Sequence, residues 1–205
     1  MYNRKDSYYK KAKKEGYKSR AAYKLLELSQ KNQLIKKGHR VLDLGAAPGG
    51  WSQVALNLVG ANGLVLAVDY AAIEGINAPN FVFIHGDMTA PDTIAAILAH
   101  AEKPAESTNG GFDVVLSDMA PKTTGIKLKD HADSIELAQL AAKTAASTLK
   151  AGGTFIVKLF DGEDRVQYVK DLQAQYKSVR TIRPDATRKS SYEMYVIATG
   201  FNSNS

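Results

Sequence analysis

The chain has 205 residues, of which 44% are hydrophobic and 23% are charged, and its net charge is +6. A chain of this length buries roughly 70% of its unfolded surface, and this composition excludes disordered and fibrous proteins, so we expect one globular domain. The absence of cysteine excludes disulfides, thiolate metal sites and cysteine nucleophiles. The sequence contains neither a signal-peptide pattern nor a membrane-spanning segment, so we expect a cytoplasmic protein without a membrane partner.

Positive charge is concentrated at the N-terminus. Residues 1–24 hold nine Lys or Arg against two acids, a balance of +7, so the remaining chain carries a net charge of −1. A second basic cluster lies between Lys177 and Lys189, and half of all tyrosines lie in the first segment. Cations interleaved with aromatic rings suit a polyanion whose bases can stack, which predicts an RNA-binding arm over residues 1–24. The alternative is a solvated, partly frayed tail.

After the arm, the pattern predicts a helix that Ser19 caps and that ends near Asn32. Short β-rich runs then predict seven strands: 40–44, 64–69, 81–85, 112–117, 154–160, 179–183 and 192–199. Helical patterns lie between most of them: 51–58, 91–101, 130–149 and 164–176.

This alternation of strands and helices predicts a mostly parallel sheet with helices on both faces. The last two strands are joined by a basic turn over 184–191 with no helix, so the final strand should run antiparallel beside its neighbour. We expect one catalytic domain over residues 25–201 and a frayed tail over residues 202–205.

A glycine-rich turn follows the first predicted strand, in the run VLDLGAAPGGW from Val41 to Trp51. A dinucleotide-binding turn needs a second glycine where this chain has Ala47, and Pro48 delays the helix, so a pyrophosphate site is disfavoured. Asp43 would also repel a pyrophosphate but would suit an ammonium group, which S-adenosylmethionine carries. A nicotinamide-dependent oxidoreductase on a Rossmann fold is the rival enzyme class.

Acidic residues end the next two strands as well. Asp69 closes LVLAVD, where a carboxylate can accept both hydroxyls of a ribose. Asp87 follows FIHG, where its oxygen could accept an adenine amino hydrogen. Each acid alone could be a helix cap or a turn former, but together they lie at the carboxyl ends of strands, where open α/β sheets bind ligands.

A lysine inside an apolar strand indicates the chemistry. Lys158 stands in TFIVKLF, where a buried ammonium is costly unless an acid pairs with it, and Asp118 and Glu193 could converge on it. The alternative is a lysine whose head reaches water at the strand end. Methylation at C5 of a pyrimidine is excluded because it needs a thiolate, and the run after the fourth strand, DMAP, lacks the motif of amino-group methylation. Oxygen methylation of a ribose fits these residues best.

Four motifs together resemble the RrmJ/FtsJ family of S-adenosylmethionine-dependent RNA ribose 2′-O-methyltransferases, whose bacterial members are also called RlmE. They are SRAAYKL at 19–25, DLGAAPGGWS at 43–52, LSDMAP at 116–121 and VKLF at 157–160. The resemblance implies a Rossmann-like methyltransferase fold and a catalytic Lys-Asp-Lys-Glu set, which by motif position is Lys24, Asp118, Lys158 and Glu193. It also implies that Lys158 accepts the hydroxyl proton.

The same resemblance implies S-adenosylmethionine contacts at Gly49, Trp51, Asp69, Asp87 and Asp118. It implies a uridine ribose of 23S ribosomal RNA, within the assembled large subunit, as the substrate. A transfer RNA methyltransferase and a non-catalytic RNA-binding or ribosome-assembly module on the same fold are the alternatives. The four histidines lack ligand spacing, so we expect no metal site and surface or strand-end positions for them. We expect a monomer.

Overall fold

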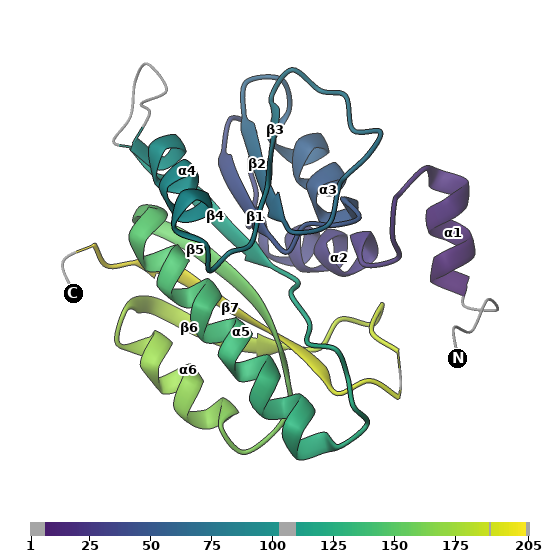
Figure 1. The fold of residues 1–205 in the computed structure, drawn as a ribbon, viewed down its shortest axis with the longest axis vertical. Coiled ribbons are helices and arrows are strands. Elements are labelled where there is room, and N and C mark those ends of the chain that lie inside the picture. Colours follow the sequence, from purple (N-terminus) through teal and green to yellow (C-terminus); the bar gives the residue numbers. More distant parts are fainter. Residues whose placement is uncertain (1–6, 103–109, 189, 204–205) are drawn as a thin grey trace.

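In the computed structural model, residues 7–102, 110–188 and 190–203 are described; the first six residues of the predicted arm, Lys189 and the last two residues of the predicted tail lie outside these ranges. Helices cover both faces of one seven-stranded sheet (Figure 1). The strands are β1 Arg40–Leu44, β2 Leu64–Asp69, β3 Phe81–His85, β4 Phe112–Ser117, β5 Leu149–Phe160, β6 Tyr176–Ile182 and β7 Glu193–Phe201. The helices are α1 Ser7–Glu15, α2 Ala22–Asn32, α3 Gly50–Val59, α4 Pro91–Glu102, α5 Lys127–Thr148 and α6 Arg165–Gln173.

The strand order is β3-β2-β1-β4-β5-β7-β6. Strands β1 to β5 pair in parallel, whereas β7 runs antiparallel to both β5 and β6. This confirms the predicted fold class, including the reversed last strand. The order turns back between β1 and β4, which is where open α/β sheets bind ligands at the carboxyl ends of their strands.

The two faces of the sheet carry separate cores. Helices α4, α5 and α6 pack on one face, where α5 presents Ile135, Ala138, Ala141 and Ala145 at helical spacing. Helices α2 and α3 pack on the other face, against strand residues such as Val41 and Ile156. Because strand side chains alternate between faces, Asp43 and Lys158 lie on the same face as Val41 and Ile156, toward α2 and α3. Within the described ranges, no helix is long and apolar enough to cross a membrane.

Several predicted boundaries were wrong. Helix α5 ends at Thr148 and β5 begins at once with Leu149, five residues earlier than predicted, because the strand continues through Gly152 with a shift in its pairing to β4. Helix α6 ends at Gln173, because Tyr176 belongs to β6 and packs its ring against Phe155. Residues 127–129, which precede the predicted helix 130–149, form the first turn of α5.

The predicted cap of α2 was also wrong. The residue before the helix is Ala21, and no side chain caps the helix by a hydrogen bond. The side chain of Ser19 lies instead against the first residue of α3, Gly50, where a β-carbon would come within 2.3 Å of the serine hydroxyl. Ser19 therefore contributes to the packing of α2 on α3 rather than to a cap.

Helix α1 occupies part of the segment that was predicted as an arm. Its buried Ala12 packs with Tyr23 of α2 and with Ala186 of the loop between β6 and β7. The rings of Tyr8 and Tyr17 lie 5.5 and 5.7 Å from that of Tyr23, whose hydroxyl donates to Glu15 over 2.7 Å. Tyrosines expected to stack on bases therefore hold α1 to α2, and Tyr23 is buried.

We expect Ala12→Gln to detach α1, because a larger polar side chain does not fit this buried contact, and overpacking typically costs about 1–3 kcal/mol. Hydrogen exchange of the α1 amides should speed up about tenfold or more, as measured by mass spectrometry. Lys13→Gln is the matched control, since Lys13 is exposed on the same helix and its replacement should leave exchange unchanged. Equal exchange in the two variants would show that Ala12 does not hold the helix.

Candidate active site

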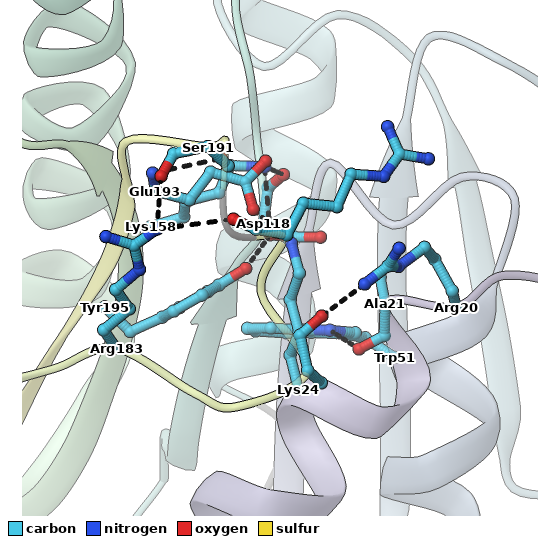
Figure 2. A network of polar contacts seen from close by, with 12 residues as sticks. Arg20, Ala21, Lys24, Trp51, Asp118, Lys158, Arg183, Ser191, Glu193 and Tyr195 are labelled. Atoms are coloured by element: carbon cyan, nitrogen blue, oxygen red, sulfur yellow. Dashed lines mark hydrogen bonds and ion pairs between the residues drawn. The ribbon is translucent and has the colours of Figure 1, made fainter. Parts of the chain in front are cut away.

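The centre of the site is an ion pair between two neighbouring strands. Lys158 lies in β5 with only 5% of its surface exposed, and its Nζ is 2.9 Å from Oδ1 of Asp118, which follows β4. The same Nζ also donates to the main-chain carbonyl of Asp118. Figure 2 shows the lysine and the acid meeting with the hydroxyl of Tyr195, which donates to Asp118 Oδ1 over 2.6 Å. The lysine is therefore paired and does not extend into water.

Opposite charges decide the ionisation of this acid. Burial alone would raise the pKa of Asp118, but Lys158, Lys24 and the hydroxyl of Tyr195 outweigh it and hold that pKa below its usual value. Asp118 is thus a carboxylate that fixes the position of the lysine head. In the opposite direction, burial and the charge of Asp118 raise the pKa of Tyr195 well above its usual value, so the phenol stays a hydrogen-bond donor.

A second ion pair lies beside the first. Nζ of Lys24, from α2, is 2.5 Å from Oε2 of Glu193 at the start of β7, and it also lies 5.5 Å from the centre of the Tyr195 ring. Glu193 pairs with Phe160 in the sheet, and Tyr195 pairs with Lys158. The structure therefore brings together all four residues predicted as the catalytic set, although they come from α2, β5, β7 and the end of β4.

A cavity of about 460 Å³ opens beside Asp118, where the strand order turns back. It is lined by Gly45, Ala47, Asp69, Tyr70, Gly86, Asp87, Met88, Thr89, Asp118, Met119, Ala120, Leu137 and Leu140. Acids thus face it from the ends of three strands, with apolar side chains between them. A β-carbon on Gly45 would lie 2.3 Å from the side chain of Met119, so glycine is needed to keep the turn against that wall.

The acids of this cavity are held in place by main-chain hydrogen bonds. The carboxylate of Asp69 accepts from the N–H groups of Ala47 and Ala71, each over 2.8 Å. One oxygen of Asp87 accepts from both the N–H and the hydroxyl of Thr89, which lowers the pKa of that carboxyl. A carboxylate has about four acceptor positions, so each acid retains capacity for a ligand hydroxyl or amino group.

Gly49 and Trp51, the other predicted cofactor contacts, do not line this cavity. Gly49 has φ 106° and precedes α3, where a β-carbon would meet Ile76 at 2.7 Å. Trp51 is buried; its indole N–H donates to the carbonyl of Ala21 over 2.8 Å and its ring lies 5.6 Å from that of Tyr195. Trp51 therefore ties α2 and α3 to the tyrosine that holds Asp118.

Asp43 differs from what the sequence indicated. We expected this acid near a ligand ammonium group, but its side chain has no exposed surface and accepts a hydrogen bond from the hydroxyl of Ser52 over 2.7 Å. Burial, reinforced by the charges of Asp118 and Asp69, raises the pKa of Asp43 to about 7 despite the bond from Ser52. Asp43 therefore joins β1 to the first turn of α3 through Ser52, and its other oxygen, Oδ1, has no hydrogen-bond partner among the described residues.

Two features of the site had no sufficient signal in the sequence. The contact between Tyr195 and Asp118 depends on the register in which β7 pairs with β5. The sequence does not give this register, so the role of Tyr195 could not be predicted. The second feature is a clamp in which Arg20 donates to the carbonyl of Ala186 and Glu27 accepts from its N–H. This clamp joins the N-terminal basic segment to the basic loop between β6 and β7, so two clusters far apart in sequence form one surface.

The histidines were only partly as expected. His131 is buried, and its ring bonds to the carbonyl of Phe160 and the N–H of Asp164, so it ties α5 to the turn after β5. A β-carbon on Gly162 would lie 2.4 Å from this ring, which explains the glycine there. Within the described ranges, no group of three or more His, Cys, Asp or Glu side chains is placed to hold a metal ion.

Comparisons with known proteins give one family for this chain. The family profile described as FtsJ-like methyltransferase matches residues 17–201. The chain is 45% identical over 198 residues to the ribosomal RNA large subunit methyltransferase E of Methanothermobacter thermautotrophicus, covering 97% of this chain and 90% of that protein. It is also 45% identical over 197 residues to the protein of the same name from Coxiella burnetii, covering 96% and 91%.

Solved structures give the same picture. A ribosomal RNA methyltransferase from Plasmodium falciparum superposes with a TM-score of 0.76 at 31% identity, over 90% of this chain and 98% of that one. A fibrillarin/Nop5p complex superposes with a TM-score of 0.59 at 21% identity, over 87% and 81%, which shows a shared fold.

We expect Asp43→Asn to change how stability depends on pH. Because the pKa of Asp43 is about 7 in the folded protein and lower in the unfolded chain, the folded state binds this proton more tightly. Its contribution to the free energy of unfolding therefore falls as pH rises from about 4 to about 7, by up to about 1.4 kcal/mol per pH unit. Urea unfolding at pH 5 and at pH 7 should show a flatter profile for the variant than for the wild type. The exposed Asp92→Asn serves as control, and parallel profiles for Asp43→Asn and wild type would contradict the assignment.

Proposed function

This chain belongs to the FtsJ-like methyltransferase family and is an RNA methyltransferase, and we propose that it methylates the 2′-oxygen of a uridine ribose in large-subunit ribosomal RNA. The observation that carries this proposal is the buried ammonium of Lys158, held 2.9 Å from Asp118 at the rim of a ligand-sized cavity. The names of the two relatives support the ribosomal substrate over transfer RNA. The intact set of four charged residues supports an enzyme over a non-catalytic module.

The cavity beside Asp118 fits S-adenosylmethionine. Asp69 and Asp87 present carboxylate oxygens that can accept ribose hydroxyls and an amino group, and Met88 and Leu140 offer apolar contacts for a flat ring. The turn at Gly45 permits close approach of the backbone. When bound there, this cofactor supplies an electrophilic methyl group. The predicted contacts at Gly49 and Trp51 would act indirectly, by shaping the start of α3.

We infer that Lys158 orients and deprotonates the attacking hydroxyl. A ribose hydroxyl is a very weak acid, so a base beside it helps form the new oxygen–carbon bond. For this step the lysine first releases to solvent the proton that it holds in the ion pair with Asp118; its neutral amine then accepts the hydroxyl proton, and the carboxylate at 2.9 Å stabilises the ammonium ion that forms. Tyr195 donates to the same carboxylate and keeps it aimed at the lysine. The Lys24–Glu193 pair then positions the substrate beside this base.

The joined basic surface supports RNA binding. The clamp at Ala186 places α1, with its exposed lysines, beside the loop that carries Arg183 and Arg188. Phosphate contacts of this kind position an RNA without reading its sequence. A ribosomal substrate supports action in the cytoplasm, and one copy of the chain contains every residue of the proposed site, which supports action as a monomer.

We expect Lys158→Ala to reduce methyl transfer to isolated large ribosomal subunits by at least about 10²-fold, the usual scale for loss of a catalytic base. Binding of S-adenosylmethionine, measured by calorimetry, should be unchanged. Lys158→Arg is the matched control: it keeps a cation beside Asp118 but cannot accept a proton at neutral pH, so it should be equally inactive. An active arginine variant, or equal loss of cofactor binding and transfer in both, would overturn the role of Lys158 as base.

We expect the double variant Lys10→Ala/Lys14→Ala to weaken RNA binding in a salt-dependent manner. Each phosphate contact that is lost should reduce the slope of log affinity against log salt by about 0.7 to 0.9. The control is Lys36→Ala/Lys37→Ala, which removes the same charge from the turn before β1, at the amino end of that strand. If both double variants lower the slope equally, net charge rather than α1 determines binding.

A further inference from the structure

We propose that a second cavity, of about 490 Å³ beyond the end of β5, receives the base of the target nucleotide, with the ring of Tyr192 as its stacking surface. This inference rests on the proposed function and adds the position of the base to it. Enzymes that modify single nucleotides in RNA commonly hold an unstacked base against an aromatic side chain.

The cavity lies next to the proposed catalytic residues. Phe160 and Asp161, which line this cavity, lie only two and three residues beyond Lys158. Glu193, which also lines it, pairs with Phe160 in the sheet and forms the ion pair with Lys24. A base in this cavity would therefore place its ribose next to the proposed catalytic groups, on the side away from the cofactor cavity. Figure 2 shows Glu193 and Ser191 lying directly beside Lys158.

The lining of this cavity combines an aromatic ring with polar groups. The ring of Tyr192 is 51% exposed; Nζ of Lys127 lies over one face, 4.6 Å from the ring centre, so a base would stack on the other face. Thr123, Ser190 and Ser191 add hydroxyl or main-chain groups around the same space. A planar ring with both donors and acceptors on its edge matches this set, because stacking tolerates any base and the edge can form hydrogen bonds.

The charge around this cavity suits a neutral base better than a phosphate. In this cavity the acids Asp161 and Glu193 are paired with Arg165 and Lys24, at 2.9 and 2.5 Å, so the local charge is close to balanced. A neighbouring cavity of about 300 Å³ shares Ser190, Ser191 and Glu193 but is otherwise lined by Arg20, Ala21, Lys24 and Arg188. The basic cavity suits a phosphate, and the cavity with balanced charge suits a neutral base. A nucleotide bound in both cavities would place its ribose beside Glu193, which lines both.

Hydrogen bonds hold the main chain on two sides of this cavity. Asp130 accepts from the N–H and hydroxyl of Thr124 and from the N–H of Gly125, at 2.6 to 3.0 Å, which fixes the loop on one side. On the other side, the N–H of Asp161 donates to the carbonyl of Tyr192 over 2.8 Å. Because the main chain is held on both sides before RNA arrives, binding of a base costs less ordering of the loops that carry the ring of Tyr192.

Binding can be tested without any methyl transfer. In the presence of saturating S-adenosylmethionine, NMR titration with uridine 5′-monophosphate should perturb the resonances of Tyr192, Phe160 and Thr123. Ribose 5-phosphate, which lacks the base, should perturb Arg188 and Ser191 but not the first three. Equal perturbation of both sets by both probes, or shifts from the uridine nucleotide only around Asp87, would overturn the proposal.

Kinetics on large ribosomal subunits give the second readout. Tyr192→Ala should lower kcat/KM for RNA by about 5- to 100-fold, the usual effect of removing a stacking ring, while Tyr192→Phe stays within about threefold of wild type. The salt dependence of RNA binding and the affinity for S-adenosylmethionine should not change in either variant. Val166→Ala, an exposed apolar position on α6, is the surface control. Equal activity of Tyr192→Ala and wild type would contradict the stacking role.

The two experiments distinguish a failure of the base cavity from a failure of the proposed function. If wild-type protein methylates no RNA but the uridine nucleotide still perturbs Tyr192, the proposed function fails and the base cavity stands. If wild-type protein methylates ribosomal RNA and Tyr192→Ala does so equally well, the function stands and the base cavity fails.

Discussion

The structure depends above all on the cost of burying the ammonium group of Lys158. An otherwise apolar strand can hold this lysine only if an acid pairs with it, and Asp118 at 2.9 Å supplies that acid. Asp118 in turn needs the hydroxyl of Tyr195 to complete its hydrogen bonds. Trp51 of α3 packs on the tyrosine ring and Lys24 of α2 lies over it, so both helices contact Tyr195. One costly charge thus organises residues from five elements.

The reversed strand makes this arrangement possible. In a purely parallel sheet, the beginning of a strand lies at the edge away from the ligand site. Because β7 runs antiparallel between β5 and β6, its first residues, Glu193 and Tyr195, lie beside the last residues of β5 (Figure 1). The carboxyl ends of the parallel strands β1 to β4 line the proposed cofactor cavity, whereas β5 and β7 carry the ion pairs and the proposed base cavity. In the proposed function, methyl transfer takes place where these two halves meet, at Asp118.

Much of this could be predicted from the chain because the signals were local. Each strand of the sheet was visible as a short β-rich run, and the turn without a helix before β7 indicated its direction. Lys158 stood out because a charge in an apolar strand needs a partner. What could not be predicted depended on tertiary contacts. Helix α1 is stabilised by Tyr23 and Ala186 rather than by its own sequence, and the burial of Asp43 depends on how α3 packs through Ser52. Trp51 and Tyr195 meet only because two helices and a distant strand pack together.

We propose that this site transfers a methyl group to a ribose oxygen of ribosomal RNA. The most direct test is to incubate the protein with large ribosomal subunits and isotopically labelled S-adenosylmethionine, digest the RNA to nucleosides, and identify the labelled product by mass spectrometry. We expect a single labelled species, 2′-O-methyluridine, from one position of the large-subunit RNA. A label on a base carbon or nitrogen would contradict the chemistry assigned to Lys158 and Asp118.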